Sequence, residues 1–408
     1  MRLFFTAALL ALPTALYAEP MTLDTALGLA ATRAPELQAR EAGIDAAQSA
    51  AIAADRLPDP KLNVALQDFP VTGPDAGRFN RDDFTMQVIG VSQDFPNPAK
   101  RRARATRAQA DIGIARADEA VTAQDVRLAT ALAWVDLFYA KKRLKELEML
   151  DTDLESLQST VTGRLASGAA RPAQALEPEQ LRAEVNDRRS ALAAEIARAR
   201  AQLARFTGDP AADTAGEAPP PTVDEATLRA GIDALPRLRA LDARALAADA
   251  ETGLARADKR PDWSVNAAYG RREPNYGDLV TLGVTIDLPF FSKKRQDPKI
   301  AARASEATRA RLDREAAKRD IAAALDADLA DHRMHHEQLD NARSRLVPLA
   351  KKRAELDLSS YAAGKLDLGT ALLSTLALAE AEVDALAREA EVARDAIRIN
   401  NLYGETGR

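Results

Sequence analysis

The sequence predicts a mainly α-helical protein with a small β part, in which very long helical hairpins alternate with short pairs of strands. Two observations predict this fold class. The first is a stretch from Pro98 to Phe206 whose apolar residues recur every three or four positions, as in a coiled-coil seam. The second is that the order of predicted elements occurs twice. The composition agrees, since only 4% of the residues are aromatic and alanine, leucine, arginine and glutamate are abundant.

The first hairpin is predicted to run out from Pro98, turn near Gly168 and return to Phe206. No proline lies between Pro98 and Pro172, so the outgoing helix would be about 100 Å long at 1.5 Å per residue. The outgoing seam contains Leu144, Leu147, Leu150, Leu154, Leu157, Val161 and Leu165, and the return seam contains Leu181, Val185, Leu192, Ile196 and Leu203. A lone hairpin of this length exposes most of its surface, so we expect it to pack against other hairpins.

A helix and two strands are predicted before each hairpin. The first helix spans residues 23–57 and should break or kink at Pro35, and the corresponding helix spans residues 224–259 and contains Pro236. Alternating apolar and polar residues predict strands at 61–69, 84–93, 263–271 and 279–288. The second hairpin should begin near residue 297, break near Pro348 and turn near Gly364. Its return seam contains Leu372, Leu376, Ala379, Val383, Leu386, Ala390, Ala393 and Ile397.

These elements form a tandem duplication. Pro35 and Pro60 match Pro236 and Pro261 at an offset of 201 residues, and Phe95-Pro96 matches Leu288-Pro289 at 193. We therefore divide the chain into a first repeat at 19–208, a proline-rich linker at 209–223 and a second repeat at 224–408.

Composition and the N-terminal residues bound the function. The net charge of −5, with both signs interspersed, gives no basic footprint for nucleic acid. Cysteine is absent, which excludes disulfides and thiolate metal sites. Arg2 followed by an apolar run from Leu3 to Leu12, with Ala18 before the expected cut, predicts a signal peptide at 1–18. We expect the mature chain to leave the cytoplasm.

Each predicted strand has one apolar and one polar face and about the 9–11 residues of a tilted transmembrane strand. The structural alternative is a small, half-buried soluble sheet. In lipid, an unpaired sheet edge costs several kcal/mol for each unsatisfied backbone group. Four strands cannot close into a barrel, because the smallest membrane barrels have about eight. We therefore expect several copies to share one barrel.

Four short motifs, in this order on a duplicated chain, resemble the TolC family of outer-membrane efflux channels. They are Ala34-Pro35-Glu36-Leu37, Leu57-Pro58-Asp59-Pro60, Gln93-Asp94-Phe95-Pro96 with Lys100-Arg101, and Tyr361-Ala362-Ala363-Gly364. The resemblance covers essentially the whole mature chain and implies a homotrimer with a twelve-stranded β-barrel and a twelve-helix periplasmic tunnel. Through residues 93–102 and Leu288-Pro289-Phe290-Phe291, the chain is most similar to the heavy-metal efflux branch.

The resemblance implies an exit duct in the outer membrane with a long periplasmic extension. The duct would be a passive conduit for solutes, metal cations being expected, and a periplasmic adaptor would link it to an inner-membrane pump. Organic drugs or a secreted protein are alternative cargoes, and a soluble periplasmic coiled-coil scaffold is an alternative of another class. The sequence contains no nucleophile paired with a base and no phosphate-binding loop, so we expect neither an enzyme nor a cofactor.

Two sets of candidate site residues follow. The resemblance implies that the hairpin tips contact the adaptor through Arg164, Leu165, Gly168, Tyr361 and Gly364, although a glycine there also ends a helix by itself. Nearby acids, Glu177 and Asp367 among them, are expected to be solvated helix positions.

His332 and His336 are four residues apart on a predicted helix, a spacing that lets two imidazoles share a metal. They also continue the apolar seam of Leu325, Leu329 and Leu339, and no third ligand is evident. The favoured interpretation is therefore that both histidines pack against neighbouring side chains and bind no metal.

Overall fold

The computed structural model describes residues 20–79, 81–166 and 171–404, apart from some side chains between 153 and 175. The predicted signal peptide lies outside these residues. The chain forms two compact units, and each takes segments from both repeats. Unit 1 contains the residues up to 38, 122–235 and those from 321 onward, and unit 2 contains 39–121 and 236–320.

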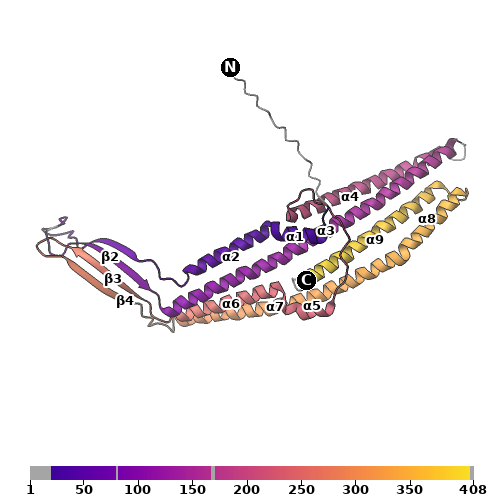
Figure 1. Ribbon diagram of the computed structural model, residues 1–408. Helices are drawn as coiled ribbons and strands as arrows, with labels where there is room; N and C mark the ends of the chain where they lie inside the picture. The colour runs from indigo at the N-terminus through magenta and orange to yellow at the C-terminus, as the bar shows by residue number, and fades with distance from the viewer. Residues whose placement is uncertain (1–19, 80, 167–170, 405–408) are drawn as a thin grey trace, which may run out of the picture. The chain divides into compact units, whose positions relative to one another are not determined.

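The helices of the first repeat follow the sequence signals closely. α1 (Leu23–Arg33) is capped by the Thr22 side chain, which accepts a hydrogen bond from the Thr25 amide at 3.2 Å. Ala34 is extended, and α2 (Pro35–Ala53) begins at the proline that was expected to break the helix. α3 (Pro98–Ala166) is one helix of 69 residues (Figure 1). After the short 3₁₀ helix η1 (Pro172–Ala175), α4 (Glu177–Thr207) ends at Gly208, whose φ is +72°.

The helices of the second repeat contain two interruptions. The predicted helix 224–259 is instead α5 (Glu225–Gly231), the 3₁₀ helix η2 (Ile232–Ala234) and α6 (Pro236–Ala257). Leu235 is extended because the ring of the following proline disfavours the helical conformation there. α7 (Gln296–Asn341) passes through a π-helical turn, η3 (Ala342–Leu346), into α8 (Val347–Ala362), just before Pro348. The return helix is α9 (Leu368–Tyr403).

The predicted seams form the core of unit 1. One apolar cluster joins both hairpins and contains Leu150, Leu154, Val161, Leu181, Val185, Leu368, Leu372 and Leu376. A second cluster surrounds Trp134, whose indole N–H donates to the Met21 carbonyl at 2.9 Å. The linker is held against this unit, since Lys141 contacts Asp213 at 2.6 Å and Asn400 donates to the Thr222 carbonyl at 2.9 Å.

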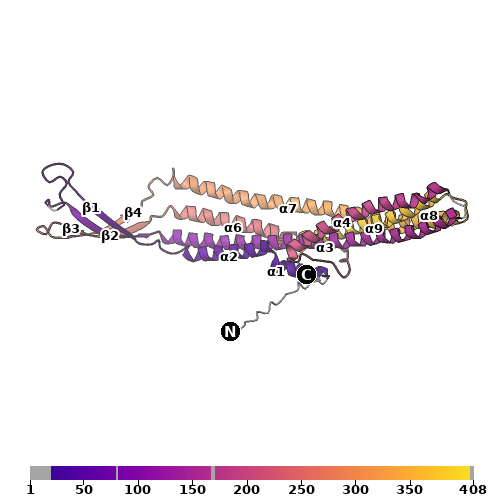
Figure 2. The same ribbon diagram turned by 90° about the horizontal axis from the view of Figure 1, so that it is seen from above.

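Unit 2 contains a sheet of four antiparallel strands in the order β1-β2-β3-β4 (Figures 1 and 2). The strands are β1 (Lys61–Gln67), β2 (Met86–Phe95), β3 (Trp263–Arg271) and β4 (Leu279–Ile286). β1–β2 and β3–β4 are the strand pairs of the two repeats, and β2–β3 is the joint between the repeats. β1 and β4 are the outer strands of the sheet, so each leaves one edge open.

Candidate functional site

The sheet has one apolar and one polar face, and the apolar face is exposed. Residues directly opposite one another in an antiparallel pair lie on the same face. The register therefore gathers on one face Leu62, Val64, Leu66, Ile89, Val91, Phe95, Trp263, Val265, Ala267, Tyr269, Val280, Leu282, Val284 and Ile286, together with Gln87, Gln93 and Arg271. Leu282 is 76% exposed and Val64 is 72% exposed. The other face is mainly polar and carries Asn63, Ser92, Asn266, Thr281 and Thr285, with Met86, Val88 and Leu279 among them. Such a sheet suits lipid on one side and water on the other.

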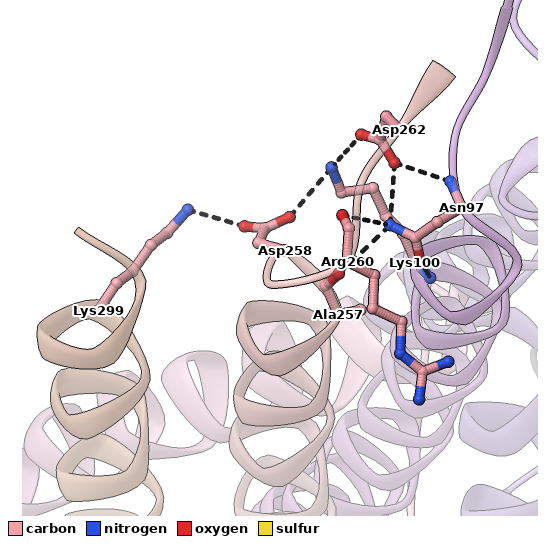
Figure 3. A network of polar contacts seen from close by, with 7 residues as sticks. All are labelled: Asn97, Lys100, Ala257, Asp258, Arg260, Asp262 and Lys299. Carbon is pink, nitrogen blue, oxygen red and sulfur yellow. Dashed lines mark hydrogen bonds and ion pairs between the residues drawn. The ribbon is translucent and has the colours of Figure 1, made fainter. Parts of the chain in front are cut away.

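A polar network holds the joint between β2 and β3 to the helices (Figure 3). The Asn97 amide and side-chain amide donate to one carboxylate oxygen of Asp262 at 2.7 and 2.9 Å. The Lys100 ammonium lies 2.7 Å from Asp262 and 3.1 Å from Asp258, and Lys299 reaches Asp258 at 3.2 Å. Burial lowers the pKa of Lys100, but the hydrogen bonds to Asp262 and Asp258 outweigh it and leave that pKa above its ordinary value.

Asn97 also starts α3. Its side-chain oxygen accepts the Lys100 amide at 2.8 Å, which is a helix N-cap. Its side-chain nitrogen also donates to the carbonyls of Ala257 and Arg260 at 3.3 and 3.2 Å. One buried asparagine therefore joins a helix start of the first repeat to a strand start of the second.

At the end of the second hairpin, Gly364 has a φ of +72°, and its amide donates to the Tyr361 carbonyl at 2.9 Å. The glycine thus ends α8, as expected. The Tyr361 side chain is only 8% exposed and packs in the apolar cluster that joins the hairpins. Gly168 and the side chains of Arg164 and Leu165 lie outside the described part of the chain.

The two acids near the hairpin ends have structural roles. Asp367 caps α9 by accepting the Thr370 amide at 3.0 Å and hydroxyl at 2.7 Å, and these hydrogen bonds lower its pKa. Glu177 is half-buried, and one of its carboxylate oxygens has no hydrogen-bond partner among the side chains and backbone groups that the structure describes. Burial first, and the charge of Asp367 second, raise the pKa of Glu177. The expectation that Glu177 is simply solvated was therefore wrong.

The histidines lie together in unit 1. His332 is 7% exposed, and its ring stands edge-on to His336 with centroids 4.8 Å apart. Among the described residues, none forms a hydrogen bond with its Nδ1. Burial, followed by the nearby His336, lowers the pKa of His332. His335 instead pairs with the buried Asp395, at 2.6 Å from Nδ1 to the carboxylate. Sequence reasoning missed Asp395, which lies on a different helix.

In residues 20–79, 81–166 and 171–404, no group of three or more histidines and acids is arranged to hold a metal ion. The predicted pair, His332 and His336, thus offers two of the four ligands of an ordinary tetrahedral site. The metal-site hypothesis stays a prediction. Among the described helices, none combines the length and the apolar character needed to cross a membrane.

Comparison with known proteins identifies the fold. No protein-family model and no curated protein sequence matches the chain. Solved structures do match. The outer-membrane channel OprN superposes with a TM-score of 0.76 at 17% identity, over 94% of this chain and 89% of that one. VceC from Vibrio cholerae gives 0.75 at 16% identity, over 94% and 96%. The CmeC channel of Campylobacter jejuni gives 0.75 at 12% identity, over 94% and 85%.

The chain has the fold of these outer-membrane channels. The predicted fold class, mainly α with long hairpins and a small four-stranded β part, is confirmed. The matches do not single out one branch of such channels, since OprN, VceC and CmeC score alike.

Proposed function

We propose that this chain is a TolC-family exit duct in the outer membrane, working in a tripartite efflux system. The observation that carries the proposal is the sheet, whose apolar face is exposed and whose two edges are open, on a fold shared with outer-membrane channels. In water, such a face and such edges would favour aggregation. In a barrel embedded in lipid, the apolar face contacts lipid and each open edge pairs with a strand of another copy.

Three copies would supply twelve strands to one barrel. Closing the barrel pairs every strand edge, which removes unsatisfied backbone groups that cost several kcal/mol each in lipid. The long hairpins of the three copies would surround a periplasmic tunnel. The duct performs no chemistry and carries no cofactor, and its energy comes from an inner-membrane pump coupled through a periplasmic adaptor.

The adaptor is proposed to bind at the hairpin ends, through Arg164, Leu165, Gly168, Tyr361 and Gly364. Because the Tyr361 ring is buried within the chain, its part is to hold the turn, and Gly364 brings the backbone close to the partner. Leu165→Glu is the sharper probe, because any side chain at Gly364 also strains the turn. We expect this variant to assemble trimers but to lose export.

The cargo is proposed to be metal cations, on the resemblance of residues 93–102 and 288–291 to the heavy-metal branch. His332 and His336 would bind cargo only transiently, since a pore must release what passes. Because His332 is only 7% exposed, His336 would be the more accessible of the two. The pump would set the selectivity.

Deletion of the gene, with complementation by the wild-type chain or Leu165→Glu, tests these roles. We expect the deletion strain to become sensitive to copper, zinc, cobalt or nickel, and only the wild-type chain to restore tolerance. Loss of resistance to organic drugs instead, or loss of a secreted protein, would overturn the cargo and leave the duct. Recovery of the chain as a soluble periplasmic protein would favour a coiled-coil scaffold and overturn the duct.

A further inference from the structure

The two strand pairs of the chain are equivalent residue by residue. Asn63 lies opposite Gly90 in the first pair, and Asn266 lies opposite Gly283 in the second. A step of 203 residues therefore relates β1 to β3, and a step of 193 relates β2 to β4. The second step also takes Phe95-Pro96 to Leu288-Pro289.

The same steps relate the segments that flank the strands. The step of 193 takes Lys100 to Lys293. The step of 203 takes Asp55 and Asp59 to Asp258 and Asp262, and it matches Pro58 with Pro261, so the strand pairing corrects by two residues the offset of 201 that matched Pro60 with Pro261. The lysine and the two aspartates of the polar network at the joint thus have equivalents beside the two outer strands, β4 and β1. Each repeat carries the same lysine and the same two aspartates.

The joint between β2 and β3 has no equivalent within one chain. There, β2 pairs with β3, and Lys100 bridges Asp258 and Asp262 at 3.1 and 2.7 Å. The equivalent of β2 with Lys100 is β4 with Lys293, and the equivalent of β3 with its two aspartates is β1 with Asp55 and Asp59. β4 and β1 are the two outer strands, at opposite edges of the sheet. In the described part of the chain, neither Lys293 nor Asp59 is in an ion pair, whereas Asp55 lies 3.8 Å from the neighbouring Arg56. A second copy can supply the missing half.

We propose that β4 of one copy pairs with β1 of the next in the register of the β2–β3 joint, so that Val284 lies opposite Val64 of the next copy. This deepens the proposed duct and rests on it. Two consequences agree with the residues present. Gly283 then faces Ala65 as Gly90 faces Ala268, where a Cβ on the glycine would lie only 3.0 Å from the alanine Cβ. Within the chain, Asn266 already leaves no room for a Cβ on Gly283.

The second consequence concerns charge. In this register Asp287 lies opposite Lys61 of the next copy, and opposite charges at directly facing positions are favourable. Lys61 also lies 2.7 Å from Asp94 of its own chain, so it would be shared between two carboxylates. Lys293 then comes near Asp55 and Asp59 of the next copy, although it lies in the turn before α7, which begins at Gln296, whereas Lys100 lies in the first turn of α3.

One position makes the joint between copies differ from the joint within a chain. Phe290 stands where the first repeat has Asn97, and Leu57 stands where the second has Arg260. Phe290 is 80% exposed and Leu57 is 39% exposed in the single chain. At the joint between copies, Phe290 therefore lies against Leu57 of the next copy, and an apolar contact replaces the hydrogen bond from Asn97 to the Arg260 carbonyl.

Cysteine cross-linking tests the register directly, because the chain has no cysteine of its own. The test pair is Val284→Cys with Val64→Cys. The off-register control is Val284→Cys with Leu66→Cys, which would be two residues out of line and beyond disulfide reach. Val91→Cys with Ala267→Cys, at the equivalent positions of the within-chain joint, shows that the geometry permits a disulfide.

Full-length variants are oxidised in outer-membrane vesicles and run on non-reducing gels. We expect the test pair to convert monomer into covalent dimer and trimer, and the off-register pair to remain monomeric. The within-chain pair should form its disulfide without any covalent oligomer. Covalent oligomers from the off-register pair, or none from the test pair in membranes that hold heat-modifiable trimers, would overturn the register and leave the duct standing. A soluble monomer would overturn both.

A second variant tests the apolar contact. Phe290→Ala should lower the temperature at which the trimer dissociates on gels, whereas Val71→Ala, which truncates an apolar side chain that is 81% exposed in the β1–β2 loop, should not. An unchanged dissociation temperature for Phe290→Ala would show that Phe290 does not lie at the joint.

Discussion

Replacing Leu282 by lysine should prevent assembly of the duct. Leu282 lies in the middle of β4, opposite Ala267, and is 76% exposed on the apolar face. A lysine on the lipid face of a membrane barrel costs about 2–4 kcal/mol near the bilayer midplane. Three copies raise the cost to roughly 6–12 kcal/mol per trimer, which is comparable to the whole stability of an ordinary domain.

The assay is the yield of heat-modifiable trimer in the outer-membrane fraction. The matched control is Thr281→Lys, because Thr281 is the neighbouring residue on the same strand but lies on the polar face. We expect the control to assemble almost normally and the Leu282 variant to be lost or degraded. Equal tolerance of both lysines, or a defect only at Thr281, would refute the assignment of the apolar face to lipid.

Three further predictions concern the polar groups. Asp262→Ala removes the bonds to Lys100 and should lower the free energy of unfolding by about 3 kcal/mol, seen as a lower thermal midpoint, while Asp262→Asn should lose less. The raised pKa of Glu177 means that its stabilising contribution is present at acidic pH and is lost as the pH rises through the folded value. The free energy of unfolding of Glu177→Gln should therefore equal that of the wild type near pH 4. At pH 7 it should exceed the wild-type value by less than about 1 kcal/mol, seen as a slightly higher thermal midpoint. Replacing both His332 and His336 by glutamine should change metal tolerance little, so a tolerance as low as that of the deletion strain would contradict the transient-site account.

The long helices and the strand alternation were predictable because their signals are local. The seam around Leu150 and Leu372 repeats every three or four residues, and both residues are buried. Element ends were less certain. β2 was expected at 84–93 but runs from Met86 to Phe95, because the preceding Asp- and Gly-rich loop carries no sharp end signal. The interruption before Pro236 was also missed, although Pro35 gave the correct break in the first repeat.

The polar contacts could not be predicted because their partners are far apart in the sequence. Asp262 and Lys100 are 162 residues apart, and His335 and Asp395 are 60 residues apart. No periodicity links such residues before the fold is known. The duplication was the one long-range signal in the sequence, because it relates Phe95-Pro96 to Leu288-Pro289 without any knowledge of contacts.

Separation of inner and outer membranes on a density gradient tests the central claim most directly. The full-length chain, expressed in a Gram-negative cell, should be recovered with the outer membrane and should run as a trimer unless the sample is heated. Recovery in the soluble periplasm, or in the inner membrane without a heat-modifiable oligomer, would contradict the account.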